Sequence, residues 1–190
     1  MGTIADEVKK CIEVMRGGGV ILYPTDTVWG LGCDATNPEA VKRIFEIKKR
    51  CDSKAMLLLV DSADRLARYV GDVPAVAWDM IELTTKPLTV IYDGARNVAP
   101  ALIAEDGSIG IRVTSEIFSK ELCYRFQKAI VSTSANVSGE PTPANFGEIS
   151  REIIDSVDHV VNFRQQEKGS AKASSIIKLT SNGIVTIIRE

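Results

Sequence analysis

The strongest constraint on the fold is a series of short apolar runs that alternate with stretches of helical periodicity. The runs span residues 20–23, 56–60, 88–92, 109–113 and 130–131. Each run is short enough to be a buried strand. Two further apolar segments, 174–179 and 184–188, alternate around a turn at 181–183, which predicts a terminal hairpin. Strands that alternate with helices are typical of an α/β domain with two or three layers.

Helices are predicted between these runs from capping residues and apolar spacing. Thr3 can cap a first helix, whose apolar residues keep helical spacing until the glycine run 17–19. Asn37 followed by Pro38 predicts the start of a second helix, which ends at the basic residues 48–50. Further helical periodicity covers residues 74–83, 115–127 and 146–157.

Length and composition predict one globular domain over residues 1–190. Of the 190 residues 45% are hydrophobic, which is enough for a substantial core. Lys and Arg number 23 against 25 Asp and Glu, so no overall positive charge draws the protein to nucleic acid or anionic membrane. No apolar stretch approaches the roughly 20 residues of a membrane span, and the N-terminus lacks a signal pattern. We therefore expect a cytoplasmic protein without membrane contacts.

The four cysteines and the single histidine do not form a recognisable reactive or metal-binding pattern. Cys11, Cys33, Cys51 and Cys123 show no paired spacing, so neither a zinc site nor a Cys–His nucleophile pair is supported. We expect reduced thiols that are mostly buried. His159 stands just before an apolar pair and is expected to be an ordinary strand-edge histidine.

Two distant segments, 24–32 and 132–139, are dense in hydroxyl-bearing residues and glycine, and each directly follows an apolar run. We therefore predict that both lie where strands end and loops begin, the usual position of ligand sites in α/β proteins. Small hydrogen-bond donors with little bulk favour an oxygen-rich, phosphorylated ligand. Neither segment matches a P-loop or a dinucleotide-binding glycine pattern, so a nucleotide would bind by other means.

Four cations, Lys48, Lys49, Arg50 and Lys54, lie at the end of the second predicted helix and in the loop after it. Such a run can simply complement the helix dipole and be solvated. Because this run leads into a predicted core strand, its side chains can also be fixed at the rim of the sheet. A converging Lys and Arg can neutralise a triphosphate there.

Three other features leave alternatives open. Asp26 can cap backbone amides in its turn, which we favour over a role as a magnesium ligand or base. Arg112 lies inside an apolar run and needs a partner, either a substrate anion or a neighbouring acid. The polar segment 164–172 is a plain surface loop or a mobile flap over a site.

Taken together, these segments resemble the YrdC family over nearly the whole chain. The matching motifs are Tyr-Pro-Thr-Asp-Thr-Val-Trp-Gly-Leu-Gly at 23–32, Lys48-x-Arg50, Lys-Pro-Leu-Thr at 86–89, Gly-Ile-Arg-Val at 110–113, Ser-Thr-Ser-Ala-Asn-Val-Ser-Gly at 132–139 and Ser-Ser-Ile at 174–176. The order and number of these motifs make the resemblance specific. It implies a YrdC-like fold, a twisted open mixed β-sheet flanked by helices around a concave basic cavity.

The resemblance also implies roles for individual residues. Seven residues occupy the family's positions around ATP: Lys48, Arg50, Lys54, Ser134, Asn136, Thr142 and Arg189. Of these, the resemblance implies that Lys48 and Arg50 are the catalytic pair. Residues at positions near the threonine are Thr27, Arg112, Ser132 and Ser174, with Arg112 as the partner of its carboxylate. Magnesium is expected to accompany ATP, and no protein metal site is implied. Differences from the family at 54–56, at 85–87 and at Thr114 concern loop geometry.

The activity implied is that of a threonylcarbamoyl-AMP synthase, a nucleotidyltransferase that uses L-threonine, bicarbonate and ATP and releases pyrophosphate. Its product would serve threonylcarbamoyl-adenosine modification of tRNA through a downstream threonylcarbamoyl transferase machinery. The chain would work as the short form without a second domain. Two alternatives are an RNA-binding module and a paralogue that keeps the fold without the modification activity; weak binding of tRNA is compatible with the expected enzyme.

Overall fold

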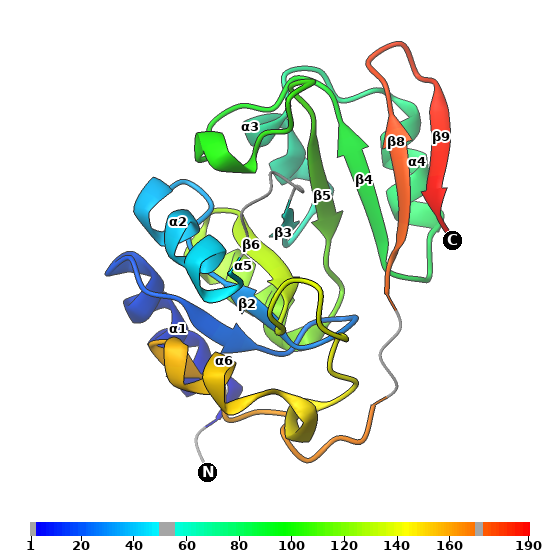
Figure 1. Ribbon diagram of the computed structural model, residues 1–190. Helices are drawn as coiled ribbons and strands as arrows, with labels where there is room; N and C mark the ends of the chain where they lie inside the picture. Colours follow the sequence, from blue (N-terminus) through cyan, green and yellow to red (C-terminus); the bar gives the residue numbers. More distant parts are fainter. Residues whose placement is uncertain (1–2, 50–55, 170–172) are drawn as a thin grey trace.

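A computed structural model describes residues 3–49, 56–169 and 173–190 of the chain. Their strands form one nine-stranded sheet in the order β7-β1-β2-β6-β3-β5-β4-β8-β9 (Figure 1). The strands are β1 (Ile21–Tyr23), β2 (Gly30–Gly32), β3 (Leu57–Val60), β4 (Leu88–Tyr92), β5 (Ile109–Val113), β6 (Ile130–Ser134), β7 (His159–Val160), β8 (Ser175–Leu179) and β9 (Val185–Arg189). The pairs β1–β7, β3–β5 and β4–β8 are parallel and the others antiparallel, so the sheet is mixed.

Helices flank this sheet, as Figure 1 shows, with α1 and α6 near one end and α4 behind the strands β8 and β9 near the other. The α-helices are α1 (Ile4–Arg16), α2 (Pro38–Ile47), α3 (Leu66–Tyr69), α4 (Val76–Leu83), α5 (Ile117–Phe126) and α6 (Arg151–Ser156). Short 3-10 turns are η1 (Ala63–Arg65), η2 (Pro100–Leu102) and η3 (Phe146–Glu148). Helix α1 packs on α5, and α5 on β3, which closes the core on that side. Within the described parts of the chain, no helix is long and apolar enough to cross a membrane.

The predicted helix starts are confirmed in their chemistry. The Thr3 hydroxyl accepts the backbone N–H of Asp6, and the Asp6 carboxylate accepts the N–H of Thr3, a complete capping box. Asn37 Oδ1 accepts two backbone N–H groups of α2, with Pro38 at the first helical position. These local signals need no tertiary partner, which is why they are visible in the sequence.

The continuous helix predicted over residues 146–157 is wrong. The segment forms the turn η3, then an extended Ile149 with ψ of 128°, and then the short helix α6. Ser150 caps α6 with its side-chain hydroxyl, and Ile149 is only 6% exposed. The cap at Ser150 and the burial of Ile149 therefore explain why the helix is interrupted. Helical spacing of apolar residues alone does not reveal either effect.

The cysteine and histidine predictions agree with the structure where it describes these residues. Cys11, Cys33 and Cys123 are buried free thiols, and burial raises the pKa of the Cys11 thiol to about 12, so it stays protonated. Cys51 lies outside the described residues. His159 is in the edge strand β7, with Nε2 at 3.0 Å from Glu7 Oε2, a contact that joins β7 to α1.

Residues 24–32, predicted to lie where a strand ends and a loop begins, return to the sheet in their last part. Residues 30–32 form β2, which pairs with both β1 and β6 in the middle of the sheet. Two glycines in three residues are unfavourable for a strand by propensity, and they are required here by close packing. A Cβ at Gly32 would lie 2.6 Å from Tyr23 Cε1 and 3.1 Å from the Val131 carbonyl oxygen.

We expect Gly32→Ala to lower the free energy of unfolding by about 1–3 kcal/mol, because the fully buried Tyr23 ring would have to move. Urea denaturation measures this change. The control is Gly110→Ala in β5, where a Cβ would meet nothing closer than Thr89 Cγ2 at 3.5 Å. Equal stability of the two variants would contradict the packing argument.

Candidate functional site

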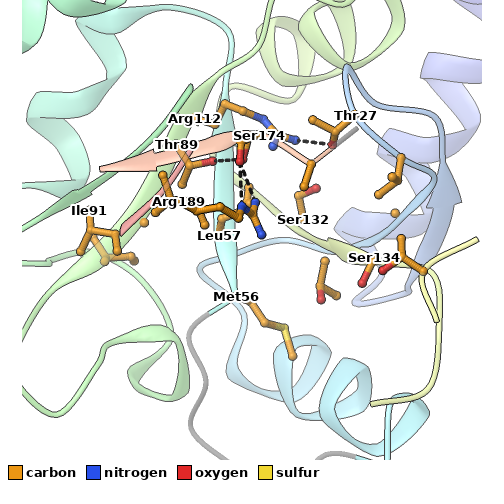
Figure 2. Close-up of a pocket in the computed structure, with 18 of the residues that line it drawn as sticks. Thr27, Met56, Leu57, Thr89, Ile91, Arg112, Ser132, Ser134, Ser174 and Arg189 are labelled. Carbon is orange, nitrogen blue, oxygen red and sulfur yellow. Dashed lines mark hydrogen bonds between the residues drawn. The ribbon is translucent and has the colours of Figure 1, made fainter. Parts of the chain in front are cut away.

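A cavity of about 570 Å³ lies against the sheet and gathers side chains from segments far apart in the sequence (Figure 2). Most of the predicted site residues line it. From the predicted threonine set these are Thr27, Arg112, Ser132 and Ser174, and from the predicted ATP set Ser134, Thr142 and Arg189. One hollow therefore brings both predicted sets together, although their individual roles remain predictions.

The lining of the cavity contains both arginine side chains and apolar side chains. Its charged lining residues, within the described chain, are Arg112 and Arg189, and no carboxylate is among them. Apolar lining side chains come from β3, β4, β5 and β8, namely Leu57, Ile91, Ile109 and Ile176. The sequence predicted Leu57, Ile91 and Ile109 as residues of core strands and did not indicate that they border the site. Such a lining suits a ligand with an anionic part and a flat apolar part.

Arg112 is paired with Asp26, which answers the question left open for both residues. Arg112 Nη2 lies 2.9 Å from Asp26 Oδ1, and the two side chains are only 2% and 8% exposed. Burial raises the pKa of the Asp26 carboxyl and lowers that of the Arg112 guanidinium, in each case against the attraction of the partner. The Asp26 carboxylate therefore serves the ion pair, and the hydrogen bonds that close the turn come from Thr25.

Arg112 makes a second contact within the wall of the cavity. Nη2 also donates to Thr27 Oγ1 at 3.4 Å, as Figure 2 shows, whereas the buried Nε has no hydrogen-bond partner among the described atoms. Arg112 therefore lines the cavity while two residues of one turn hold its guanidinium in place.

The loop that carries Asp26 and Thr27 is closed by Thr25. The Thr25 hydroxyl donates to the Val28 carbonyl oxygen at 2.7 Å and accepts the backbone N–H of Thr27 at 3.1 Å. Thr25 is 4% exposed, so these bonds are protected from water. The hydroxyl thus performs the turn-closing role that the sequence assigned to Asp26, and it fixes Thr27 at the cavity.

Arg189 reaches the cavity because of an irregularity in β9. Ile177 pairs with Ile187, but the next residue of β8, Ile176, pairs with Arg189, so Ile188 is an extra residue in β9. In a regular strand Arg189 would share the face of Ile187, on the other side of the sheet from Ile176. The bulge places Arg189 on the face of Ile176, and both line the cavity. This effect could not be seen in the sequence.

Ser174 is held by two other lining residues. The Arg189 Nε and Nη2 atoms donate to the Ser174 carbonyl oxygen at 3.0 and 2.7 Å, and the Ser174 and Thr89 hydroxyls are 2.9 Å apart (Figure 2). Thr89 is 2% exposed and was not predicted as a site residue. The available signal was its place in the Lys-Pro-Leu-Thr motif at 86–89.

Lys48 and Asn136 do not line the cavity but build the loop behind it. Lys48 is 3% exposed, and its Nζ donates to the carbonyl oxygens of Ser134 at 2.6 Å and Asn136 at 2.7 Å. The Asn136 amide donates to the carbonyl oxygens of Val137 and Glu140. Both side chains therefore shape the turn that follows β6 and presents Ser134 to the cavity.

The remaining predicted residues are only partly covered by the structure. Arg50 and Lys54 lie outside the described residues, and so does the stretch 170–172 of the polar segment 164–172. The described part of that segment is anchored, since Arg164 Nη1 donates to the Thr25 carbonyl oxygen at 3.2 Å. In the described residues no cluster of three or more His, Cys, Asp or Glu side chains could hold a metal ion.

Comparisons with known proteins agree with this architecture. The family model Sua5_yciO_yrdC, described as "Telomere recombination", matches residues 13–190. A threonylcarbamoyl-AMP synthase of Pseudoalteromonas translucida (strain TAC 125) is 33% identical over 181 residues, 94% of this chain and 95% of that protein. One of Halorhodospira halophila (strain DSM 244 / SL1) is 32% identical over 164 residues, 86% of each chain.

Solved structures share the fold. E. coli YciO has a TM-score of 0.84 and 27% identity over 100% of this chain and 91% of its own. P. abyssi Sua5 complexed with L-threonine has a TM-score of 0.80 over 90% of this chain and 50% of its own, and at 23% identity it supports the fold alone. The family match over most of the chain, the related sequences and the shared mixed sheet lead to one conclusion: the chain belongs to the Sua5/YciO/YrdC family.

Proposed function

We propose that the protein is a threonylcarbamoyl-AMP synthase, an enzyme that joins L-threonine, bicarbonate and ATP into threonylcarbamoyl-AMP and pyrophosphate. The observation that supports this most is the single cavity in which Arg112 and Arg189 lie together with the hydroxyls of Ser132, Ser134 and Ser174. The curated relatives that carry this activity in their names match nearly the full chain.

The amino acid is proposed to bind beside Arg112. The guanidinium of Arg112 lines the cavity and suits a carboxylate, and Thr27 and Ser132 supply hydroxyls for the threonine amine or hydroxyl. Ser174, fixed by Arg189 and Thr89, completes this wall. A structural relative, P. abyssi Sua5, has been solved with L-threonine, which is consistent with the proposal.

The nucleotide is proposed to bind towards Arg189, Ser134 and Thr142, with its base against the apolar wall of β3, β4 and β5. Arg189 would contact phosphate oxygens, and the hydroxyls would add hydrogen bonds without charge. Lys48, Arg50, Lys54 and Asn136 remain proposed members of this site. In the geometry described, Lys48 and Asn136 would act by holding the loop after β6.

The chemistry proposed is electrostatic and needs no side-chain nucleophile. The threonine amine combines with bicarbonate to give a carbamate and water. A carbamate oxygen then attacks the α-phosphorus, the bond to the bridging oxygen breaks, and pyrophosphate leaves. Because both reactants are anions, fixed cations and alignment lower the barrier. Since the described lining contains no carboxylate, magnesium would be carried by the phosphates of ATP and would neutralise the leaving pyrophosphate.

The test is release of pyrophosphate by the purified protein. It should require ATP, L-threonine, bicarbonate and magnesium together, and the product should be trapped as threonylcarbamoyl-AMP by mass spectrometry. The product would pass to the threonylcarbamoyl transferase machinery that modifies tRNA. A paralogue without this activity would bind nucleotide but release no threonine-dependent pyrophosphate, and an RNA-binding module would instead bind RNA with steep salt dependence.

Arg189→Gln is expected to raise the KM for ATP by roughly tenfold or more, because a charged hydrogen bond to phosphate is lost at the cavity. Steady-state kinetics with varied ATP measures this. Arg125→Gln is the control, since Arg125 is an exposed helix residue paired with Glu121. A deletion of Ile188 should leave the KM for ATP near that of the wild type, because Arg189 would then follow Ile187 directly and pair with Ile176. An unchanged KM for ATP in Arg189→Gln would remove Arg189 from the proposed site.

A further inference from the structure

Arg164 lies outside the cavity lining but connects two segments that build the wall around Arg112. Its Nη1 donates to the Thr25 carbonyl oxygen at 3.2 Å and lies 3.3 Å from Glu116 Oε1. Its Nε donates to Glu167 Oε2 at 2.7 Å. The side chain thus ties the turn 25–28 to the beginning of α5.

The turn held by Arg164 is the one that meets Arg112. Asp26 and Thr27 of this turn both contact Arg112 Nη2, at 2.9 and 3.4 Å. Thr25 closes the turn through its hydroxyl and offers its carbonyl oxygen to Arg164. A displacement of Thr25 would therefore move the two residues that orient the buried guanidinium.

The other anchor, Glu116, is a rigid one. Its two carboxylate oxygens cap α5 by accepting the backbone N–H groups of Phe118 at 3.1 Å and Ser119 at 2.7 Å, and its side chain is 9% exposed. Burial is the main cause that raises the pKa of Asp26, and the negative charge of Glu116 raises it further, as a like charge does. Arg164 lies against Glu116 and so partly neutralises the charge that would push the turn away.

We propose that Arg164 is a positioning residue for the amino-acid side of the cavity. It holds the turn 25–28 against α5 and offsets the Glu116 charge, so that Asp26 and Thr27 keep Arg112 in place. The inference rests on the synthase function proposed above and adds a residue that acts through this turn, not on the substrate. The backbone of Arg164 has a φ of 62°, in the left-handed region that glycine adopts without strain.

The test uses Arg164→Gly, which removes the side chain without straining this backbone. We expect the KM for threonine to rise by roughly tenfold, a size typical of a misplaced binding group, with little change in kcat or in the KM for ATP. Adding Glu116→Gln to this variant should lower the KM for threonine again, because it removes the Glu116 charge that Arg164 no longer offsets. An active Arg164→Gly protein with an unchanged KM for threonine would overturn the proposal.

A matched control and a second measurement separate this inference from the proposed function. Arg43→Ala also removes a guanidinium that binds one carboxylate, of Asp158, and one carbonyl oxygen, of Ser156, and it should leave the KM for threonine unchanged. Hydrogen exchange of the amides at 26–28 needs no catalysis. Faster exchange in Arg164→Gly but not in Arg43→Ala supports the proposal, and equal exchange overturns it. A wild-type protein without threonine-dependent pyrophosphate release would contradict the proposed function alone.

Discussion

Arg112→Met is expected to lower the free energy of unfolding by about 3–5 kcal/mol and to abolish measurable threonine binding. The reason is that Asp26, 8% exposed, would stay in place without its guanidinium partner. Removing one member of a buried pair leaves an uncompensated charge, which costs more than the pair itself contributes. Urea denaturation measures the stability and isothermal titration calorimetry the binding.

The control is the double variant Arg112→Met with Asp26→Asn. It removes both charges, so it should be more stable than Arg112→Met alone, while threonine binding stays lost because the proposed carboxylate partner is missing. If Arg112→Met alone cost no more than the double variant, the ion pair would not be a buried, coupled pair.

The loss of folding stability in Arg112→Met should also depend on pH. Burial raises the pKa of Asp26 and the Arg112 guanidinium lowers it, so the variant has a higher Asp26 pKa than the wild type. An acid whose pKa is higher in the folded than in the unfolded state loses folding stability as the pH rises through that interval and regains it as the pH falls. Relative to the wild type, the variant should therefore be least stable at neutral pH and recover towards acidic pH.

Lys48→Met is expected to lower the free energy of unfolding by about 3 kcal/mol and to raise the KM for ATP. Two charge-assisted hydrogen bonds, to the carbonyl oxygens of Ser134 and Asn136, would be lost in a site where Lys48 is 3% exposed. The turn after β6 would then no longer hold Ser134 at the cavity. Thermal and urea denaturation with ATP kinetics measure both effects.

The neighbouring Lys49 provides a matched control. Lys49 Nζ pairs with Glu152 at 2.6 Å, but both side chains are more than half exposed, so Lys49→Met should change stability little. Equal losses in the two variants would show that burial of Lys48 does not matter. A stable Lys48→Met protein with poor ATP kinetics would instead favour a direct contact of Lys48 with the nucleotide.

Some parts of the fold could be predicted because they depend on neighbours along the chain. The strands β4 and β5 have the predicted bounds, and α1 and α2 begin at the predicted caps. Apolar runs and capping side chains act within a few residues, so a linear sequence contains their full signal. The prediction of one helix over 146–157 failed because Ser150 caps a new helix and Ile149 is buried in an extended conformation, although the apolar spacing is helical.

The sequence predicted which residues belong to the site better than it predicted how they are arranged. The motifs located Thr27, Arg112, Ser132 and Ser174, which do meet in one cavity. Their resemblance to a family could not show that Arg112 has Asp26 as a buried partner. Sequence reasoning also missed Thr89, whose contact with Ser174 depends on the pairing of β4 with β8.

The sequence by itself determined most of the elements, their order and the residue types available for binding an anionic ligand, since these follow from local spacing and composition. Only the tertiary structure decided that Gly32 lies in a central strand against Tyr23, that a bulge turns Arg189 towards the cavity, and that Lys48 bonds to carbonyl oxygens. Each of these depends on contacts between strands or loops distant in sequence. Their energies arise only when the sheet brings those segments within a few ångströms, so no short-range pattern encodes them.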